Sequence, residues 1–413
     1  MKFLHAADIH LDSPLTGLSS RGTVPAHVTE QCTRRAFANL IDLAITQDVA
    51  FVIIAGDLYD ADWRDYGTGL FFAGEMRRLQ RPCFLIRGNH DARSVITRTL
   101  EPPPNVRELS AHKPETIILD DLGVAIHGQS FPNRAVPEDL SASYPPFVTG
   151  RLNIGVLHTS AEDPGEHQTY APCSLQSLML KGYDYWALGH IHTRRTWQQG
   201  QTRIVFPGNI QGRHAREPGA KGCTLVDVED GRVTGLQHHM TDVLRWAAIP
   251  VPLDGAETMA ELSERVRVEL ALARDQADGR PLIVRLTLQG VTPCHAAIAA
   301  DVQAIEAECR NAATAINGEL FIEHVRIETR MPAAPRDPTG SSAELIEEAF
   351  RLALEDPETQ DRLLSEFASL AAQLPAAAGA DIRRPPKTLE ELRALAPDAW
   401  HRVAQALTGS GHA

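Results

Sequence analysis

The 413-residue sequence predicts an α/β fold, and two observations support this prediction. Short continuous apolar segments alternate with longer stretches that have the apolar spacing of helices, which is the pattern of strands buried on both faces and connected by helices. Polar side chains follow directly where several of the apolar segments end. Because open α/β sheets place their functional sites at the carboxyl ends of strands, the same pattern predicts where a site should lie.

The first strands and helices are expected in regular alternation. Residues 3–8 are expected to form a short strand, and residues 30–47 a helix whose apolar side chains recur at helical spacing. The continuous apolar residues 51–55 predict a buried strand, after which residues 70–79 form a helix and residues 83–86 the next strand. This part of the chain therefore supplies one set of strands with helices between them.

A second set of strands is expected in the middle of the chain. The apolar segments that predict it cover residues 117–119, 124–128, 153–157, 185–189 and 204–206. A hairpin then begins at residues 224–228 and turns at Asp230-Gly231, a pair that favours the tight type I′ turn.

Residues 242–330 have a different character. Their pattern predicts strand, helix, strand, helix and strand over residues 246–251, 257–274, 282–288, 296–315 and 320–329. This βαβαβ order carries no clustered His or Asp, so we expect a separate, non-catalytic domain. The predicted boundaries are residues 1–240 for the first domain, 241–331 for the second, 332–340 for a Pro-rich linker and 341–413 for a C-terminal helical region.

The C-terminal region is expected to consist of amphipathic helices beyond linkers. Ser341 opens the first helix with a capping box, and Pro357 interrupts that helix before it resumes as far as residue 374. Residues 375–387 predict a second linker, and the last helix covers residues 388–407. Two interpretations stay open, because these helices could pack on their own domain or bind a partner protein.

The charge of the chain is unevenly distributed. The net charge of −13 argues against a protein that binds nucleic acid by bulk charge alone. Residues 1–240 carry 23 Lys and Arg against 26 Asp and Glu, a net charge of −3, and residues 241–413 carry the other 17 against 27, a net charge of −10. The N-terminal part is therefore nearly neutral, and the acidic character belongs to the C-terminal part.

Targeting signals are not evident in the sequence. No apolar segment approaches the ~20 residues that span a membrane, and the N-terminus lacks the long apolar segment of a signal peptide. The six cysteines are scattered and form no Cys-x-x-Cys pair, as expected of reduced thiols. We therefore expect a cytoplasmic protein without membrane contact.

Eight polar residues follow the ends of the predicted strands. They are Asp8, His10, Asp57, Asn89, His90, His158, His190 and His192. Carboxylate, amide and imidazole groups without a thiolate suit Mn, Fe or Zn ions and disfavour a structural zinc site of thiolates. Eight residues exceed the needs of one ion, whereas two ions about 3.5–4 Å apart that share a carboxylate would use them and can hold a phosphodiester for in-line attack.

Each of these residues, taken alone, has an ordinary structural explanation. A single His at the end of a strand is more often hydrogen-bonded than bound to a metal, Asp57 could be a turn residue after Gly56, and Asp8 could be a cap. Five such motifs at one kind of position make coincidence improbable, so metal binding is the preferred interpretation.

A resemblance to the calcineurin-like metallophosphoesterases rests on five motifs within roughly residues 1–240. These motifs are Asp8-Ile9-His10, Gly56-Asp57, Gly88-Asn89-His90-Asp91, His158 and Gly189-His190-Ile191-His192. Within that superfamily, residues 6–11 and 55–60 look most like the nuclease subunits of SbcCD-type DNA repair complexes. Residues 10–14 and 207–214 are similar to the YhaO-like branch of DNA repair exonucleases.

The resemblance implies a four-layer α/β/β/α sandwich with a small capping domain and C-terminal helices. It implies two divalent metal ions, for which we expect Mn²⁺, with Fe or Zn as alternatives. The implied ligands are Asp8, His10, Asp57 and His192 for the first ion, and Asp57, Asn89, His158 and His190 for the second. His90 would act beside the scissile phosphate rather than as a ligand, with Asp91 as an orienting carboxylate.

The implied function is that of a DNA exonuclease in DNA repair. A hydroxide bridging the metals would attack the phosphodiester while His90 assists the leaving group. Arg213 and His214 follow a strand that should end near the site and are expected to contact the substrate. The resemblance also implies an SMC-like (SbcC/YhaN-type) ATPase as a partner of the C-terminal helices, and homodimers are common among SbcCD-like nucleases.

Two alternative functions remain open at this point. A metallophosphoesterase acting on small nucleotides or phosphomonoesters would use the same metals. A non-catalytic adaptor in a repair complex would keep the fold without the metals, but no ligand position is substituted here, which argues against it.

Overall fold

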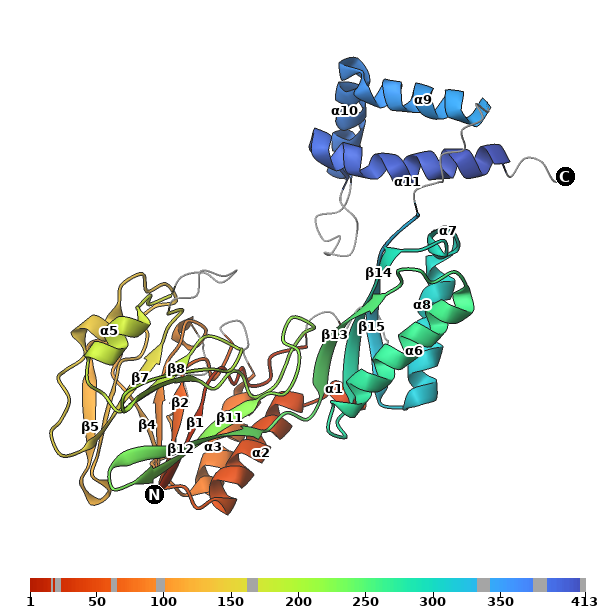
Figure 1. Ribbon diagram of the computed structural model, residues 1–413. Helices are drawn as coiled ribbons and strands as arrows, with labels where there is room; N and C mark the ends of the chain where they lie inside the picture. The colour runs from red at the N-terminus through yellow and green to blue at the C-terminus, as the bar shows by residue number, and fades with distance from the viewer. Residues whose placement is uncertain are drawn as a thin grey trace. The chain divides into compact units, whose positions relative to one another are not determined.

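The computed structural model describes residues 1–15, 18, 24–60, 65–93, 101–161, 170–332, 342–373 and 385–408 (Figure 1). Two six-stranded sheets have the orders β12-β11-β1-β2-β3-β4 and β5-β6-β7-β8-β10-β9, and a three-stranded sheet has the order β13-β14-β15. Helices flank the two large sheets, which confirms the predicted α/β class.

The first sheet contains the strands that begin the chain. They are β1 (Lys2–Ala6), β2 (Phe51–Ala55), β3 (Cys83–Ile86), β4 (Val106–Glu108), β11 (Gly222–Glu229) and β12 (Arg232–Met240). Strands β1 to β4 are parallel, and β11 joins β1 in the antiparallel sense, with Leu4 opposite Val52 on one side and Leu225 on the other. The first strand ends at Ala6 rather than residue 8, so Asp8 already lies on a loop.

Two helices cover one face of this sheet. Helices α2 (Cys32–Thr46) and α3 (Tyr66–Leu79), red and orange in Figure 1, pack their buried apolar side chains on β1, β2 and β3. Helix α3 begins four residues before the predicted start at Leu70, because the side chain of Asp65 accepts a hydrogen bond from the Gly67 amide at 2.8 Å and caps the first turn.

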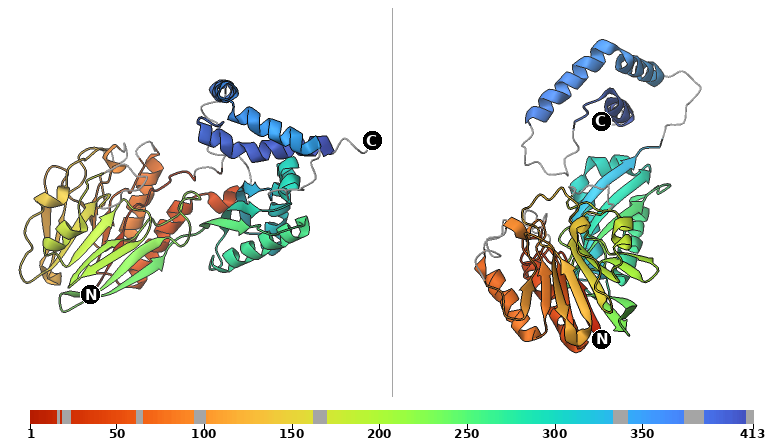
Figure 2. Two further views of the ribbon diagram at one scale, coloured as in Figure 1. Left: turned by 45° about the horizontal axis from the view of Figure 1, so that its top comes forward. Right: turned by 90° about the vertical axis from the view of Figure 1, so that its left-hand side faces the viewer.

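The second sheet contains the strands from the middle of the chain. They are β5 (Glu115–Leu119), β6 (Val124–Gly128), β7 (Leu152–His158), β8 (Tyr185–Gly189), β9 (Arg195–Gln199) and β10 (Thr202–Phe206). Strands β6, β7, β8 and β10 are parallel, and the antiparallel strands β5 and β9 close the two edges. Figure 2 shows both large sheets from two further directions.

Apolar side chains fill the space between the two large sheets. Phe3 on β1 stacks on Phe51 with ring centroids 5.0 Å apart and meets the edge of Tyr185, from the second sheet, at 5.3 Å. Helix α5 (Leu175–Leu180) covers the other face of the second sheet, where Trp186 donates a hydrogen bond to the carbonyl of Leu178 at 3.0 Å. Helix, sheet, sheet and helix thus form successive layers.

Several short elements were not predicted. They are β4, β9, α1 (Ala26–Thr29), α5 and the 3-10 turns Asp91–Arg93, Asp120–Leu122 and Leu140–Ser143. Segments of three to six residues are too short to show a period, and contacts with neighbouring elements stabilise them.

The three-stranded sheet follows the predicted order with one correction. Its elements are β13 (Arg245–Pro252), α6 (Met259–Asp275), β14 (Leu282–Val291), α7 (His295–Ala300), α8 (Val302–Ile316) and β15 (Leu320–Arg330). The single helix predicted over residues 296–315 is wrong, because the backbone of Asp301 leaves the helical region (φ −143°) and divides it into two.

The C-terminal helices form where the sequence predicts them. Helices α9 (Ser342–Glu355) and α10 (Pro357–Gln373) are separated before Pro357 as predicted, and α11 (Leu389–Thr408) follows. The rings of Phe350 and Trp400 pack 5.6 Å apart between α9 and α11. The predicted cap at Ser341, the linker over residues 333–340 and most of the second linker lie outside the described residues.

The chain divides into two compact units. The first comprises Met1–Ala248, Ala271–Arg285 and Ile316–Glu323, and the second comprises Ile249–Leu270, Leu286–Ala315 and His324–Ala413. All eight polar residues singled out above lie in the first unit. No helix in the described part of the chain has the length and apolar character needed to cross a membrane.

Candidate metal centre

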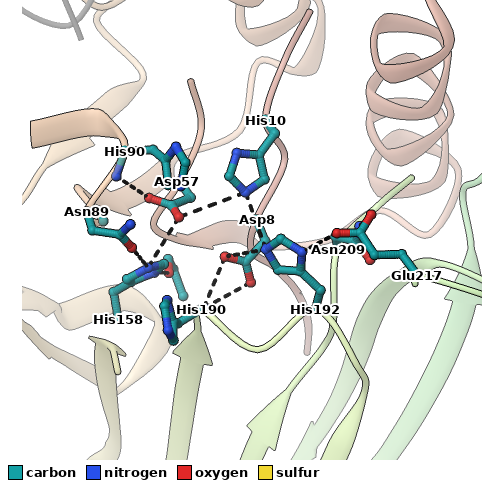
Figure 3. A network of polar contacts seen from close by, with 12 residues as sticks. Asp8, His10, Asp57, Asn89, His90, His158, His190, His192, Asn209 and Glu217 are labelled. Carbon is teal, nitrogen blue, oxygen red and sulfur yellow. Dashed lines mark hydrogen bonds and ion pairs between the residues drawn. The ribbon is translucent and has the colours of Figure 1, made fainter. Parts of the chain in front are cut away.

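The polar residues predicted at strand ends meet at one edge of the two large sheets (Figure 3). Asp8 and His10 follow β1, Asp57 follows β2, and Asn89 and His90 follow β3, all in the first sheet. From the second sheet, β7 ends at His158, and His190 and His192 follow β8. The carboxyl ends of five parallel strands therefore supply the site, as expected for an α/β fold.

The backbone at the site is strained at several non-glycine residues. Asp8, His10 and Asp57 adopt left-handed conformations with φ of 52°, 45° and 53°, and His190 has φ of 102°. These conformations are costly for residues with a Cβ atom and cluster at functional sites. Backbone hydrogen bonds hold them in place, because the amides of Asp8 and His10 donate to the carbonyls of Gly56 and Asp57 at 3.0 Å each.

Two glycines allow the loops to approach so closely. A Cβ atom on Gly88 would lie 2.3 Å from Oδ1 of Asp57 and 2.8 Å from the ring of His158. A Cβ atom on Gly56, whose φ is 93°, would lie 2.4 Å from Nδ1 of His158. The glycines in the motifs Gly56-Asp57 and Gly88-Asn89 are thus required by the packing of the neighbouring functional side chains.

The first group of potential ligands comprises Asp8, His10 and His192. One ligand atom from each lies within 4.8 Å of the others. The Nε2 atoms of His10 and His192 are 3.4 Å apart, and Nε2 of His192 is 3.9 Å from Oδ1 of Asp8. Two imidazole nitrogens and a buried carboxylate that converge in this way suit a divalent cation.

The second group comprises Asp8, Asp57 and His158, again within 4.8 Å of one another. Nε2 of His158 is 3.4 Å from Oδ2 of Asp57 and 3.0 Å from Oδ1 of Asn89. The same Oδ2 of Asp57 is 3.9 Å from Nε2 of His10. Asp8 belongs to both groups, and Asp57 lies between His10 of the first group and His158 of the second, where one carboxylate can contact two cations.

His190 contacts members of these groups through two different parts of the residue. Its backbone amide donates to Oδ1 and Oδ2 of Asp8 at 3.0 Å each and holds that carboxylate in place. Its ring lies against the rings of His158 and Tyr170, with centroids 5.2 and 5.3 Å apart. The ring thus lies on the His158 side, where the resemblance places the second ion.

A third group brings His10, Asp60 and His90 together. Oδ1 of Asp60 is 2.7 Å from Nδ1 of His10 and 3.0 Å from Nδ1 of His90. Burial lowers the pKa of His90, but Asp60 and Asp57 raise it by more, so the net shift is upward. His90 is 35% exposed, in contrast to the fully buried His10 and His158, and is the most accessible imidazole at the centre.

Asp91, expected to orient His90, makes other contacts. Its carboxylate accepts hydrogen bonds from the amides of Leu58, Tyr59 and Gly88 at 3.0, 2.8 and 3.2 Å. These bonds tie the loop after β2 to the loop after β3. Burial and the nearby Asp57 raise the pKa of Asp91 to about 7. The carboxylate in contact with His90 is that of Asp60, and Asp91 instead holds the loops.

Hydrogen bonds to the outer ring nitrogens orient two of the histidines at the centre. Nδ1 of His192 is 2.5 Å from Oε1 of Glu217, and Nδ1 of His158 is 3.0 Å from the carbonyl of Ala55. In both rings Nε2 is left to face the centre. Partners of this kind fix the tautomer and the orientation of metal-binding histidines.

Sequence reasoning did not assign roles to Asp60 and Glu217. Asp60 was visible within the motif that contains Asp57, three residues further along. Glu217 was visible only as an acidic residue in a loop with Arg213, His214 and Arg216. Each lies several residues beyond the end of a predicted strand, so a search for polar residues directly after strands does not find these two.

Burial and close pairing shift the pKa values of the ionisable groups at the centre. Burial would raise the pKa of Asp57, but His158 holds it well below its usual range. Burial would lower the pKa of His158, but Asp57 raises it to about 9. For Asp8, burial dominates and raises the pKa. Buried carboxylates that lack a full complement of positive charge are stabilised when divalent cations are present.

Arg213 and His214 lie beside the centre. Nη1 of Arg213 is 3.7 Å from Oδ2 of Asp60 and 3.2 Å from the hydroxyl of Ser13, and its side chain is only 14% exposed. Nε2 of His214 is 3.6 Å from Glu217, and its side chain is 31% exposed. The structure therefore brings both residues near the other predicted residues, with His214 the more accessible.

Comparisons with known proteins agree with this geometry. Residues 1–194 match the family described as calcineurin-like phosphoesterase, and residues 246–330 match the one described as metallophosphoesterase YhaO, middle domain. The chain is 35% identical over 303 residues to an uncharacterized metallophosphoesterase YhaO of Bacillus subtilis, covering 71% of this chain and 72% of that protein.

More distant relatives are DNA double-strand break repair proteins named Mre11. The chain is 30% identical to the protein of Sulfurisphaera tokodaii over 59% of this chain and 63% of that protein. It is 27% identical to the protein of Methanopyrus kandleri over 65% of this chain and 62% of that protein, so it spans less than two thirds of either. The resemblance seen in the sequence is confirmed, and the chain belongs to the calcineurin-like metallophosphoesterases, hydrolases of phosphoester bonds that use divalent metal ions.

Proposed function

We propose that this protein is a dinuclear-metal-dependent DNA exonuclease that hydrolyses phosphodiester bonds in DNA repair. The observation that carries the proposal is the position of Asp57, whose Oδ2 is 3.9 Å from Nε2 of His10 and 3.4 Å from Nε2 of His158. A carboxylate that lies between histidines of two ligand groups suits a pair of ions that holds a phosphodiester. The Mre11 relatives, named for DNA double-strand break repair, support DNA as the substrate.

The proposed ligands are those that the resemblance implies, and the two groups contain five of the seven. Those of the first ion are Asp8, His10, Asp57 and His192, and those of the second are Asp57, Asn89, His158 and His190. Oxygen and imidazole donors without sulfur suit Mn²⁺, which is the proposed ion, and also admit Fe or Zn. When bound, two such ions supply positive charge for the phosphoryl oxygens and a water that is nucleophilic near neutral pH.

His90 is the proposed catalytic residue that is not a ligand. Its Nδ1 lies 3.0 Å from Asp60, so Nε2 is the nitrogen available to a substrate oxygen. The negative charge of Asp60 and Asp57 favours the protonated ring, which can donate a hydrogen bond to the phosphoryl group and a proton to the leaving oxygen. Asp91 supports this arrangement indirectly through the loop amides that it binds.

Arg213 and His214 are the proposed substrate contacts. Arg213 lies against Asp60 and Ser13, next to the loop that carries His10. The more exposed His214 is better placed to meet the DNA backbone from solvent. Affinity for DNA is expected to be modest without a partner, because the chain as a whole is acidic.

The proposed domain organisation keeps residues 1–240 as the nuclease domain, 241–331 as a capping domain and 341–413 as a helical region that binds an SMC-like ATPase. Several large apolar side chains on these helices are exposed. They are Ile346, Leu352, Leu370 and Leu389, at 39%, 54%, 51% and 40%. Amphipathic helices with such faces suit docking on another helical surface. A homodimer and a cytoplasmic location, where the buried free cysteines would stay reduced, complete the proposal.

An assay with end-labelled linear DNA tests the proposed function. Wild-type protein with Mn²⁺ should shorten the DNA from its ends, and His90→Ala in the same preparation should not. A panel of phosphomonoesters and cyclic nucleotides is run in parallel. If the protein hydrolyses these small compounds and does not cleave DNA, it is a phosphoesterase of small molecules and the proposal is wrong. If the folded protein binds no Mn, Fe or Zn, it is a non-catalytic adaptor.

Deletion of residues 341–413 tests the proposed partner region. The shortened chain should retain nuclease activity and lose binding to a purified SMC-like (SbcC/YhaN-type) ATPase. If binding to the ATPase is unchanged, these helices are not part of the interface with it. Sedimentation of the full chain reports whether it is a dimer.

A further inference from the structure

We propose that Glu217 and Lys221 are positioning residues for His192, one holding its ring and the other its main chain. The inference rests on the proposed role of His192 as a metal ligand. Neither residue belongs to the five motifs, and neither is part of the ligand groups found among the described residues. Both lie on the segment between β10 and β11, which also carries Arg213.

Glu217 determines which ring nitrogen of His192 carries hydrogen. Its Oε1 is 2.5 Å from Nδ1, and a carboxylate can only accept, so Nδ1 donates. The lone pair of Nε2 is then free to face the centre, where this atom is 3.4 Å from Nε2 of His10 and 3.9 Å from Oδ1 of Asp8. A metal ion binds the unprotonated nitrogen, so the contact with Glu217 prepares His192 for binding.

Glu217 is itself held in place. Its second oxygen accepts hydrogen bonds from the side-chain amide of Asn209 at 3.0 Å and from the backbone amide of Arg213 at 2.8 Å. Figure 3 shows the carboxylate of Glu217 in contact with the ring of His192. The side chain of Glu217 is 5% exposed. A buried carboxylate with partners on both oxygens keeps one orientation, and it transmits that orientation to the ring.

Lys221 acts on the backbone of the same ligand. Its ammonium group donates to the carbonyl of His192 at 3.0 Å, although the residue is only 6% exposed. Its own backbone is fixed, because its carbonyl accepts from the amide of Thr241 at 3.0 Å. Burying an ammonium group is costly, so a lysine in this position is explained better by a specific contact than by packing.

His192 depends on such contacts more than the other ligands do. Its side chain is 21% exposed, whereas those of His10 and His158 are 1% and 0% exposed. The ring of His192 makes an edge contact with the ring of His10, with centroids 5.2 Å apart, and its Nδ1 contacts Glu217 at 2.5 Å. Because the ring of His192 is more exposed than those of His10 and His158, the hydrogen bond to Glu217 has a larger part in orienting it.

The experiment measures Mn²⁺ binding and the His192 tautomer in the full chain. Titration followed by electron paramagnetic resonance of free Mn²⁺ should give two sites for the wild type. Glu217→Gln should weaken one of them by about 10- to 100-fold and leave the other unchanged. Glu217→Asp keeps the charge but moves the carboxylate away from His192, and it should weaken the same site by about 10-fold. Lys221→Met should weaken that site to a similar extent.

A second readout uses the metal-free protein. Nitrogen-15 spectra of labelled histidine, assigned with His192→Ala, should show His192 with hydrogen on Nδ1 in the wild type and in Lys221→Met. Glu217→Gln should give a mixture of tautomers. Glu323→Gln is the matched control, because Glu323 is also a buried carboxylate, 3% exposed and 3.0 Å from Arg285. This variant should leave both the Mn²⁺ affinity and the His192 tautomer unchanged.

The outcomes separate this inference from the proposed function. If His192→Ala retains both Mn²⁺ sites, the metal-binding role of His192 is wrong. If His192→Ala loses one site while the Glu217 variants keep wild-type affinity and tautomer, only the positioning role is overturned. If Glu323→Gln also loses both Mn²⁺ sites, replacing any buried carboxylate weakens metal binding. The positioning role of Glu217 would then be overturned as well.

Discussion

The carboxylate of Asp60 lies 3.0 Å from Nδ1 of His90 and joins the proposed catalytic histidine to the candidate metal ligand His10, whose Nδ1 is 2.7 Å away. One oxygen atom, Oδ1, makes both contacts. The orientation of the two rings is therefore coupled through a single side chain, which sequence spacing alone did not reveal.

Replacement of Asp60 should impair both neighbours. Asp60→Asn keeps the size of the side chain but removes its negative charge, so the protonated form of His90 loses stabilisation. We expect kcat for a phosphodiester to fall by about 10- to 100-fold, with weaker Mn²⁺ binding at one site. Asp42→Asn, which removes an exposed partner of Arg78, is the control and should leave both quantities unchanged. Wild-type turnover by Asp60→Asn would contradict the coupling.

His90→Ala should separate chemistry from metal binding. Loss of a proton donor at the substrate is expected to lower kcat by about 10²- to 10⁴-fold. Metal content, measured by mass spectrometry after gel filtration in Mn²⁺, should stay at the wild-type level because His90 is not among the proposed ligands of either ion. His112→Ala, at an exposed histidine, provides the comparison. If His90→Ala instead loses metal, His90 is a ligand and its assignment as the catalytic residue is wrong.

The sequence predicted the large elements and the residues at strand ends because both depend on local patterns. A buried strand such as Phe51–Ala55 is visible as an apolar segment, and Asp57 is found by looking just past its end. The contact between His192 and Glu217 joins residues 25 positions apart through an irregular loop, and no periodicity marks it. The break at Asp301 was likewise invisible, since residues on both sides favour a helix.

The assignment of Asp91 shows a related limit. Its position next to His90 in the chain suggested that it orients that ring. In the structure its oxygens turn instead to the amides of Leu58, Tyr59 and Gly88, and a carboxylate from the neighbouring strand end reaches His90. Adjacent residues on a loop point in different directions, so adjacency in sequence does not establish contact.

Gly88→Ala should disrupt the centre although it adds a single methyl group. The new Cβ would lie 2.3 Å from Oδ1 of Asp57 and 2.8 Å from the ring of His158, so the shared carboxylate must move. We expect Mn²⁺ binding to fall at both sites and the free energy of unfolding to fall by about 1–3 kcal/mol, as for other overpacked positions. Calorimetric titration and urea unfolding measure the two effects.

Gly74→Ala is the matched control for this substitution. Gly74 lies within α3, and an added Cβ there meets no atom within 4 Å. Alanine is favoured over glycine inside a helix by roughly 0.5–1 kcal/mol, so this variant should be slightly more stable and bind metal normally. Equal metal binding by the two variants would show that the loop after β3 adapts to the extra atom.

Burial of His5 should make the protein less stable in acid. His5 is 0% exposed between the two large sheets, its Nδ1 is 2.9 Å from the hydroxyl of Tyr185, and burial lowers its pKa from 6.5 to about 3. Between pH 6.5 and 3 the unfolded chain therefore binds a proton at His5 that the folded chain excludes. The free energy of unfolding must then decrease as the pH falls through this range, by up to about 1.4 kcal/mol per pH unit from this residue.

Chemical unfolding from pH 7 down to pH 4 measures this contribution as a difference between variants. His5→Gln cannot take up the proton, so its free energy of unfolding should decrease less steeply with falling pH than that of the wild type. His112→Gln makes the same replacement at a histidine that is exposed to solvent and serves as the control variant. Parallel curves for the wild type and His5→Gln would mean that the folded protein admits a proton at His5, and the acid sensitivity would then have to come from other groups.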